Sequence, residues 1–229
     1  MKKLNTSECF YSIQGEGVTM GVPSVFLRLG GCNLMCKGSG WICDSIEVWS
    51  KSVATEFKDV IKQDWVDRLE LGAHLVITGG EPLLHQNKLI EYLHWFRIEY
   101  GFYPFVEVET NGTIIPAAEF TVYVQQWNCS PKLSNSGETK ERRYKHEVLE
   151  LLSYLNTQFK FVVSSKEDIK EIQDDFSYFG WEKFVLMPAG DSFESLKFTR
   201  QLVAEECIRL GWRYCDRLHI VIWNKKTGV

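Results

Sequence analysis

The sequence predicts an α/β fold with a mainly parallel sheet. Short β-branched or aromatic runs alternate with segments of helical periodicity along the chain, a pattern typical of right-handed βαβ crossovers. Polar motifs directly follow several of the predicted strands, where parallel sheets gather their functional groups. The 229 residues suit one well-buried unit better than two, so we expect a single domain over residues 1–229.

Each element is placed by its own signal. Strands are predicted where short apolar runs are rich in β-branched or aromatic residues: 25–29, 75–78, 105–109, 122–127, 159–163, 184–187 and 218–222. Helices are predicted where apolar residues recur on one helical face: 55–69, the segment between Asn87 and Gly101, 144–155, 166–179 and 194–210. Gly30 and Gly31 end the first strand, while Asn87 is the expected cap and Gly101 the expected stop of the second helix.

Composition and charge exclude several classes of protein. Hydrophobic residues make up 45% and charged residues 24% of the chain, which is typical of globular proteins rather than disordered ones. With 26 Lys and Arg against 30 Asp and Glu, the net charge of −4 argues against a nucleic-acid partner. No apolar run approaches a membrane span, and the first residues hold no apolar core of a signal peptide. We therefore expect a cytoplasmic protein without membrane contact.

Three of the seven cysteines carry the most specific information. Cys32, Cys36 and Cys43 fall within twelve residues, just after the first predicted strand, whereas the other four are scattered. Three close thiols in a reducing compartment hold Zn²⁺ with a fourth ligand or an iron–sulfur cluster, unless they are merely buried. No second cysteine pair or close histidine pair completes a zinc site. A [4Fe–4S] cluster held by three cysteines keeps one iron open to a small molecule.

Two further motifs follow predicted strands and meet the cysteines at the same edge. Gly79-Gly80-Glu81 follows the second strand, and Ser130-Pro131-Lys132 follows the fourth. Glycines allow a ligand to approach the backbone, and Glu81 offers an acceptor for an ammonium group. Taken alone, the first motif favours a tight turn with Pro82 at the first helical position, whereas beside the cysteines it favours ligand binding.

These residues resemble a known enzyme family. The spacing Cys32-x₃-Cys36 with Trp41-x-Cys43-Asp44, together with Gly79-Gly80-Glu81-Pro82, is similar to the radical S-adenosylmethionine enzymes. Three more segments narrow the resemblance to the 7-carboxy-7-deazaguanine synthase (QueE) family: residues 12–17 (SIQGEG), 26–34 (FLRLGGCNL) and 130–132 (SPK). The resemblance runs from about residue 8 to the segment 217–219 and so covers nearly the whole chain.

The family implies a fold, an activity and a set of cofactors. The fold is a partial (β/α) barrel of the radical S-adenosylmethionine type. The reaction converts 6-carboxy-5,6,7,8-tetrahydropterin to 7-carboxy-7-deazaguanine with ring contraction and loss of ammonia, in queuosine-type deazapurine biosynthesis. A [4Fe–4S] cluster on Cys32, Cys36 and Cys43 cleaves S-adenosylmethionine, and Mg²⁺ assists. An electron donor such as a flavodoxin and a homodimeric state are also implied.

The family also implies roles for individual residues. S-Adenosylmethionine is expected at Gly79, Gly80, Glu81, Ser130, Pro131 and Lys132. The pterin is expected at Ile13, Gln14, Gly15, Arg28, Thr78 and His219. In this pairing the guanidinium of Arg28 binds the pterin carboxylate; the less favoured alternative is an internal salt bridge to Glu16 or Glu81. His219 lies in a predicted strand, where a lone histidine is more often a core residue.

Three departures from the family pattern concern the same sites. The family commonly closes its cysteine motif as C-x₃-C-x₂-C, whereas six residues separate Cys36 and Cys43 here; we interpret them as a lengthened loop. Ser45 replaces the usual threonine and retains the oxygen donor that Mg²⁺ needs. Met187 replaces a glutamine near the adenine end of S-adenosylmethionine and cannot hydrogen-bond in the same way.

Two other functions remain open at this stage. A radical S-adenosylmethionine activase acting on a protein partner would need a docking face and no Arg28. A metal-stabilised binding module would have no turnover at all. Formation of 5′-deoxyadenosine after anaerobic reconstitution separates the binding module from both enzymes.

Overall fold

A computed structural model describes residues 2–38, 42–43, 45–226 and 228–229. Trp41 and Asp44 of the cysteine motif lie outside these residues. The strands are β1 (Lys3–Ile13), β2 (Pro23–Leu29), β3 (Val53–Glu56), β4 (His74–Gly79), β5 (Phe105–Thr110), β6 (Gln126–Cys129), β7 (Thr157–Val163), β8 (Phe184–Pro188) and β9 (Arg213–Tyr214). The α-helices are α1 (Ile46–Trp49), α2 (Phe57–Val60), α3 (Gln63–Glu70), α4 (Gln86–Tyr100), α5 (Ala118–Thr121), α6 (Lys140–Arg143), α7 (His146–Ser153), α8 (Lys166–Phe176), α9 (Phe193–Leu210) and α10 (Leu218–Trp223).

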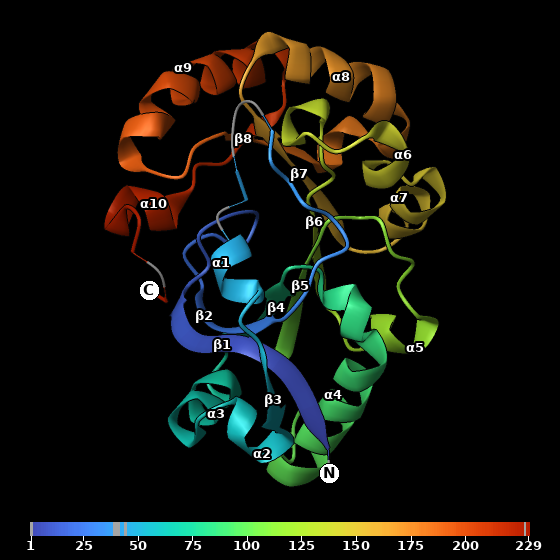
Figure 1. Cartoon of the computed structure of the whole chain (residues 1–229), viewed down its shortest axis with the longest axis vertical. Helices are drawn as coiled ribbons and strands as arrows, with labels where there is room; N and C mark the ends of the chain where they lie inside the picture. The colour runs from blue at the N-terminus through green and yellow to red at the C-terminus, as the bar shows by residue number, and fades with distance from the viewer. Residues whose placement is uncertain (1, 39–41, 44, 227) are drawn as a thin grey trace.

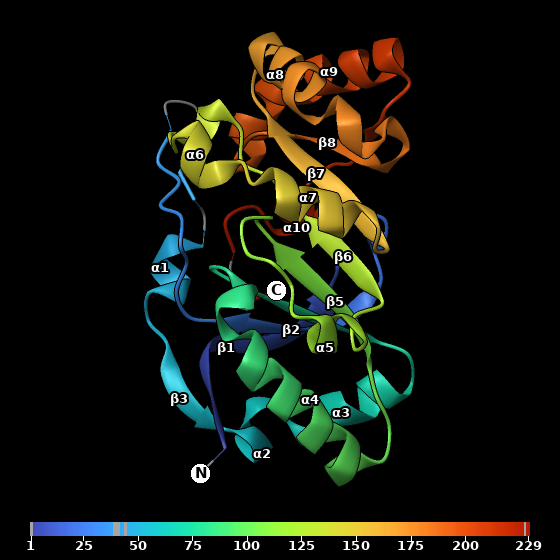
Figure 2. The same cartoon turned by 90° about the vertical axis from the view of Figure 1, so that its right-hand side faces the viewer.

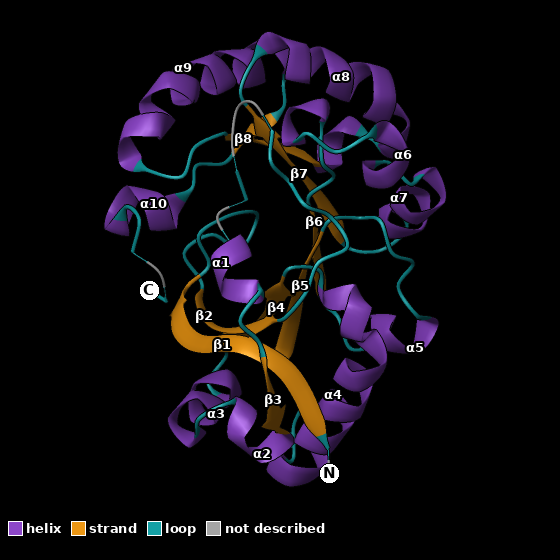
Figure 3. Ribbon diagram, viewed as in Figure 1, coloured by secondary structure: helices purple, strands orange, loops and turns teal. Residues whose placement is uncertain are grey.

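The described strands form one open, curved sheet in the order β3-β1-β2-β4-β5-β6-β7-β8-β9. From β2 through β9 the neighbours are parallel, while β1 pairs antiparallel with β2 and β3. Figures 1 and 3 show the strands as an arc with α4, α7, α8 and α9 outside it. The predicted α/β class and mainly parallel sheet are therefore confirmed, and the open arc matches a partial barrel.

Alternation along the strands separates an apolar outer face from a polar inner face. In β7 the outward Phe159 and Phe161 are fully buried, and the inward Gln158 and Lys160 alternate with them. The same alternation places Trp127 outside and Asn128 inside on β6. The outer side chains join those of α4, α7 and α8 in the main hydrophobic core. Because side chains alternate across a strand, one sheet holds a core and a polar interior.

The helices gather at both ends of the molecule. Figure 2 agrees with Figure 1 that α8 and α9 lie side by side at one end, with α2, α3 and α4 at the other. The helix α4 begins at Gln86, one residue before the predicted cap, and ends at Gly101, whose φ of 87° is the left-handed conformation expected of a terminal glycine. Within the described residues, no helix combines the length and apolarity needed to cross a membrane.

Several predicted elements are wrong in extent or type. The predicted helix 55–69 is a strand and two short helices, because Thr55 pairs with Leu4 of β1 and Ile61 adopts an extended conformation. The predicted strand 122–127 begins only at Gln126, after the short helix α5. The strand β1 was missed, since its sequence mixes polar and apolar residues on a half-exposed surface.

The most consequential error concerns the C-terminal run 218–222, predicted as a strand. It forms the helix α10, in which the amides of Ile220 and Val221 donate to the carbonyl of Arg217. Only Ile220 of this helix is buried, and the two-residue β9 takes the last place in the sheet. A short apolar run does not distinguish helix from strand by periodicity. His219 therefore lies on a helix rather than in a strand.

Candidate active site

The cysteine loop and the first glycine motif meet directly at the carboxyl ends of β2 and β4. The amide of Glu81 donates to the carbonyl of Gly31 at 2.9 Å. A Cβ atom on Gly80 would lie 2.1 Å from that carbonyl oxygen and 2.7 Å from the Cβ of Cys32. Only glycine permits this approach. The two predicted motifs are therefore one structural unit, with Gly79 and Gly80 beside the first cysteine.

The lengthened loop brings its last cysteine back to the second one. Lys37 and Ile42 pair as an antiparallel bridge, and the amide of Cys43 donates to the carbonyl of Cys36 at 3.1 Å. The extra residues therefore do not carry Cys43 away from the motif. This geometry agrees with a longer loop that keeps all three cysteines together.

Electrostatic interactions among the three thiols contribute to the pKa values of Cys32 and Cys36. Burial is the main cause that raises the pKa of Cys36 to about 11, and the nearby Cys43 and Cys32 raise it further. Burial likewise raises the pKa of Cys32, with a smaller contribution from Cys43. The ammonium of Lys132 opposes both shifts. Thiols must lose their protons to bind iron, and Lys132 is placed to favour that form.

No group of three or more His, Cys, Asp or Glu side chains surrounds a single-ion position within the described residues. The donor set that is present consists of three thiols on one loop, next to backbone that glycines leave accessible. Thiolates are the ligands of iron–sulfur clusters, and these three fit that chemistry.

Glu81 is fully buried and its carboxylate already has protein partners. It accepts from the amides of Leu83 (3.0 Å) and Asn111 (2.7 Å) and from the hydroxyl of Thr110 (2.9 Å). Burial raises its pKa, although these hydrogen bonds oppose the shift. Pro82 begins a short 3₁₀ helix that Glu81 caps. Glu81 thus builds the turn, and the accessible backbone lies at Gly79 and Gly80.

The segment after β5 joins the cysteine loop to the same turn. The side-chain amide of Asn111 donates to Asn33 at 2.9 Å and approaches the sulfur of Cys32 at 4.0 Å. Its backbone amide binds Glu81, as described above. Asn111 follows the third predicted strand at the same rim, and its two contacts fix the first cysteine against the glycine motif.

The Ser130-Pro131-Lys132 segment lies on the same rim. The amide of Ser130 donates to the carbonyl of Thr110 at 2.7 Å, and the ammonium of Lys132 donates to the hydroxyl of Ser130 at 3.0 Å. Pro131 is buried between them. Because Lys132 also affects the pKa of two cysteines, all residues expected to hold S-adenosylmethionine gather around the cysteine loop.

A second group of predicted residues forms a row across three neighbouring strands. Arg28 on β2 is in register with Glu8 on β1 and Thr78 on β4. Its Nε donates to Glu8 at 2.7 Å, and its Nη1 donates to the hydroxyl of Ser45 at 3.3 Å. Arg28 does form a salt bridge, but with Glu8 rather than with Glu16 or Glu81. The loop after Cys43 thereby places Ser45 beside Arg28 and Thr78.

The remaining predicted residues lie at the end of β1, in the turn after it and on α10. The amide of Leu218 donates to the carbonyl of Gly15 at 2.9 Å. A Cβ on Gly15 would lie 2.3 Å from Nδ1 of His219, so the ring packs directly against this glycine. Ile13 is the last residue of β1. His219 is thus a neighbour of the Gln14-Gly15 turn, although it comes from a helix.

The side chain of Gln14 is occupied within the protein. Its Nε2 donates to Glu109 at 3.2 Å and to Glu107 at 3.4 Å, and its Oε1 accepts from the amides of Gly15 and Glu16. It is 3% exposed. The Gln14 amide is therefore held by protein partners within this turn and on β5.

Comparison with known proteins identifies the family. The model of 4Fe-4S single cluster domains matches residues 13–116, which include the three cysteines. The chain is 36% identical to the 7-carboxy-7-deazaguanine synthase of Halobacterium salinarum, over 96% of this chain and 91% of the relative. The chain belongs to the 7-carboxy-7-deazaguanine synthase family. The family's enzyme from Pyrobaculum aerophilum is 32% identical over 99% of this chain and 97% of its own.

A solved structure supports the same family from the fold. The crystal structure of QueE from Escherichia coli superposes with a TM-score of 0.69 at 26% identity, covering 96% of each chain. The 7-carboxy-7-deazaguanine synthase family thus accounts for the open sheet and for the cysteine loop after β2. The expected resemblance is confirmed.

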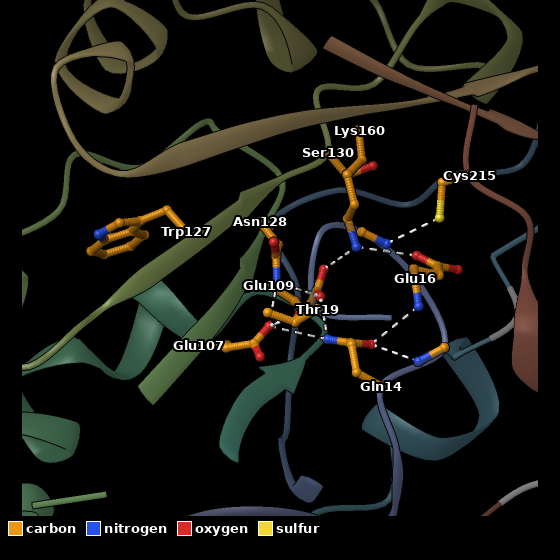
Figure 4. Close-up of polar contacts among 12 residues, drawn as sticks. Gln14, Glu16, Thr19, Glu107, Glu109, Trp127, Asn128, Ser130, Lys160 and Cys215 are labelled. Carbon is orange, nitrogen blue, oxygen red and sulfur yellow. Dashed lines mark hydrogen bonds and ion pairs between the residues drawn. The ribbon is translucent and has the colours of Figure 1, made fainter. Parts of the chain in front are cut away.

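The sequence missed the buried polar residues inside this family's barrel. Glu107, Glu109, Asn128 and Lys160 all lie on inner positions of β5, β6 and β7 (Figure 4). Trp127 points to the opposite side of the same sheet. Strands covered on both faces normally show continuous apolar runs. In 105–110 and 157–163, by contrast, polar or charged residues alternate with apolar ones, and this alternation indicates a polar interior.

Proposed function

We propose that this chain is a 7-carboxy-7-deazaguanine synthase that converts 6-carboxy-5,6,7,8-tetrahydropterin to 7-carboxy-7-deazaguanine and ammonia. The observation that carries the proposal is the meeting of three thiols, an accessible glycine backbone and Lys132 on one rim, above a polar barrel interior. Family membership over nearly the full chain supports the same reaction. No contact or surface of the described residues favours an activase or a binding module.

Cys32, Cys36 and Cys43 would hold the [4Fe–4S] cluster. The reduced cluster would supply the electron that cleaves bound S-adenosylmethionine, and the 5′-deoxyadenosyl group released as a radical would remove a hydrogen atom from the substrate. The protein's own part is to bind, orient and exclude water. The backbone of Gly79 and Gly80 would contact the methionine end of S-adenosylmethionine, and Ser130-Pro131-Lys132 would contact its ribose and carboxylate.

The row on β1, β2 and β4 would bind the pterin. Arg28 has a partner on Nε and on Nη1, and a planar guanidinium has five donors in all, so further donors remain for a carboxylate. Thr78 lies next to it in register. The turn of Ile13, Gln14 and Gly15, with His219 packed against it, would contact the ring from the other side.

The proposed adenine contact differs from the family pattern. Met187 is 2% exposed and packs with Val185 and Cys215 in a small apolar cluster. Backbone groups after β8 or the nearby Asp191 would therefore take the place of the family's glutamine. We also propose that the protein works in the cytoplasm, because an oxygen-sensitive cluster needs a reducing compartment. We propose further that it is a homodimer and that it receives electrons from a donor such as a flavodoxin.

The test is a full reaction. The chain is reconstituted anaerobically with iron and sulfide and incubated with S-adenosylmethionine, Mg²⁺, a reductant and the carboxy-tetrahydropterin. The expected result is 7-carboxy-7-deazaguanine, identified by mass. Formation of 5′-deoxyadenosine without this product would show a radical S-adenosylmethionine enzyme with another substrate.

A mutation at Ser45 tests the proposed Mg²⁺ contact. The hydroxyl of Ser45 lies beside Arg28, where a cation could meet both this oxygen and the substrate. We expect Ser45→Ala to weaken the activation by Mg²⁺ and Ser45→Thr to keep it. The measurement is the reaction rate against Mg²⁺ concentration, with Ser50→Ala at the exposed end of α1 as control. Equal Mg²⁺ dependence in wild type and Ser45→Ala would contradict a role for this side chain.

A further inference from the structure

Lys160 is a charged side chain that neither the cluster nor the proposed S-adenosylmethionine site uses. It lies at an inner position of β7 and is 1% exposed. Its ammonium donates to Glu109 at 2.6 Å and to Glu16 at 3.1 Å (Figure 4). These two carboxylates come from β5 and from the segment after β1. One buried cation thus connects three parts of the chain that are distant in sequence.

The residues around Lys160 form two layers. Glu107, Asn128 and Gln14 are at most 3% exposed and make the lower layer. The carboxylate of Glu107 accepts from Thr19 (2.8 Å), Asn128 (2.9 Å), Gln14 (3.4 Å) and His74 (2.5 Å). Glu16 and Glu109 keep side-chain exposures of 18% and 21%. They are the part of this network that a molecule in the barrel can reach.

Each oxygen of the exposed carboxylates has a defined neighbour. Glu109 accepts from Lys160 on Oε2 and from Gln14 and Asn128 on Oε1. Glu16 accepts from Lys160 on Oε2 and from Arg217 on Oε1 at 3.0 Å. Lys160 binds both carboxylates. Without its charge, the two carboxylates would repel each other inside the barrel.

We propose that Lys160 is a positioning residue, which fixes the carboxylates of Glu16 and Glu109 as a pair of acceptors for the N–H groups of the substrate heterocycle. This inference rests on the proposed function, because a pterin is the molecule whose N–H groups these acceptors would meet. Lys160 acts through the two glutamates and does not itself touch the substrate. Its cost in desolvation is offset by two charge-assisted hydrogen bonds.

The ammonium of Lys160 lowers the pKa of both carboxylates and so favours their ionised state. Burial raises the pKa of Glu109, with further increases from Glu16 and Glu107, and Lys160 opposes these. Burial also acts to raise the pKa of Glu16, but Lys160, Arg217 and His219 outweigh it and hold that pKa well below its usual range. Burial lowers the pKa of Lys160, yet the two carboxylates raise it above the ordinary value.

The experiment compares wild type, Lys160→Gln and Lys160→Arg as reconstituted enzymes. The probe is 6-carboxypterin, whose aromatic ring lacks the saturated hydrogens of the substrate. We expect Lys160→Gln to bind the probe at least about tenfold more weakly and to raise KM more than it lowers kcat, because a binding contact is lost. Cluster content and uncoupled cleavage of S-adenosylmethionine should stay unchanged. The control is Lys170→Met, an exposed lysine on α8.

The pH dependence distinguishes positioning from simple structural support. Loss of an opposite charge raises the pKa of a carboxyl group, so Glu109 in Lys160→Gln takes up its proton at higher pH. A protonated carboxyl has one acceptor oxygen fewer. As the solution is acidified, probe binding by Lys160→Gln should therefore be lost at a higher pH than probe binding by the wild type. Lys160→Arg keeps the charge. The acid limb of its pH profile, where probe binding is lost on acidification, should therefore stay at the wild-type pH. A merely destabilised fold would not move this limb.

The outcomes are distinct. Wild-type probe affinity and an unmoved acid limb in Lys160→Gln would overturn the positioning role while product formation by wild type still upheld the function. If Lys160→Gln does not fold, Lys160→Arg decides: its altered geometry should raise KM at least about threefold, and an unchanged KM would overturn the proposal. A wild-type enzyme that neither binds the probe nor forms product would remove the function itself.

Discussion

Replacing Cys43 with alanine is expected to abolish the reductive cleavage of S-adenosylmethionine. Of the three expected ligands, Cys43 is the one that follows the lengthened loop. The bridge between Lys37 and Ile42 returns it to Cys36. A cluster that loses one of three thiolates has no other described cysteine on the same loop. Iron and sulfide per chain and the yield of 5′-deoxyadenosine measure the loss. Cys32→Ala and Cys36→Ala should give the same result.

The matched control for this prediction is Cys207→Ala. Cys207 is 4% exposed on α9 and packs in the main hydrophobic core, far in sequence from the loop. Its replacement removes a thiol but should leave cluster content and cleavage intact. If Cys43→Ala kept a full cluster and activity, Cys43 would not be a cluster ligand, and the lengthened loop would have a different purpose.

The sequence predicted most of the parallel part of the fold because five of its strands have a local signal. The runs at β2, β4, β5, β7 and β8 are bounded by glycines or turns and were located within a few residues. The antiparallel β1 carries polar residues at half-exposed positions, and its pairing with β3 is long-range. A local sequence pattern carries no information about that pairing. The same limit explains why the helix α10 was taken for a strand.

The candidate site divides in the same way. Motifs of special residue types, such as the cysteines and Gly79-Gly80, are visible in one sequence because their chemistry is rare elsewhere. The partner of Arg28 was not predictable, because Glu8 reaches it through the register of two strands. Lys160 was hidden for another reason: a lysine in a strand is usually at the surface, and only the barrel brings two carboxylates to it.

Arg28→Ala is expected to lower kcat/KM for the carboxy-tetrahydropterin at least about tenfold. A bidentate, charge-assisted contact with a carboxylate is worth about 1.5–3 kcal/mol, and each ~1.4 kcal/mol is a factor of ten in rate. Arg28→Lys keeps the charge but not the planar fork, so it should recover only part of the loss. The control is Arg68→Ala on α3, whose guanidinium lies over the ring of Tyr11.

The salt bridge with Glu8 makes this prediction sharper, because it offers a structural explanation for the same arginine. If Arg28 serves only β1–β2 pairing, Glu8→Gln should reduce thermal stability and activity together, as should Arg28→Ala. If Arg28 serves the substrate, Glu8→Gln leaves a guanidinium that still binds the carboxylate, and activity should fall much less than in Arg28→Ala. Cluster content and uncoupled cleavage of S-adenosylmethionine should survive all three variants, because Arg28 contacts Glu8 and Ser45 and none of the cysteines. Normal turnover by Arg28→Ala, or loss of its cluster, would show that the arginine is structural and that the pterin carboxylate is held by another group.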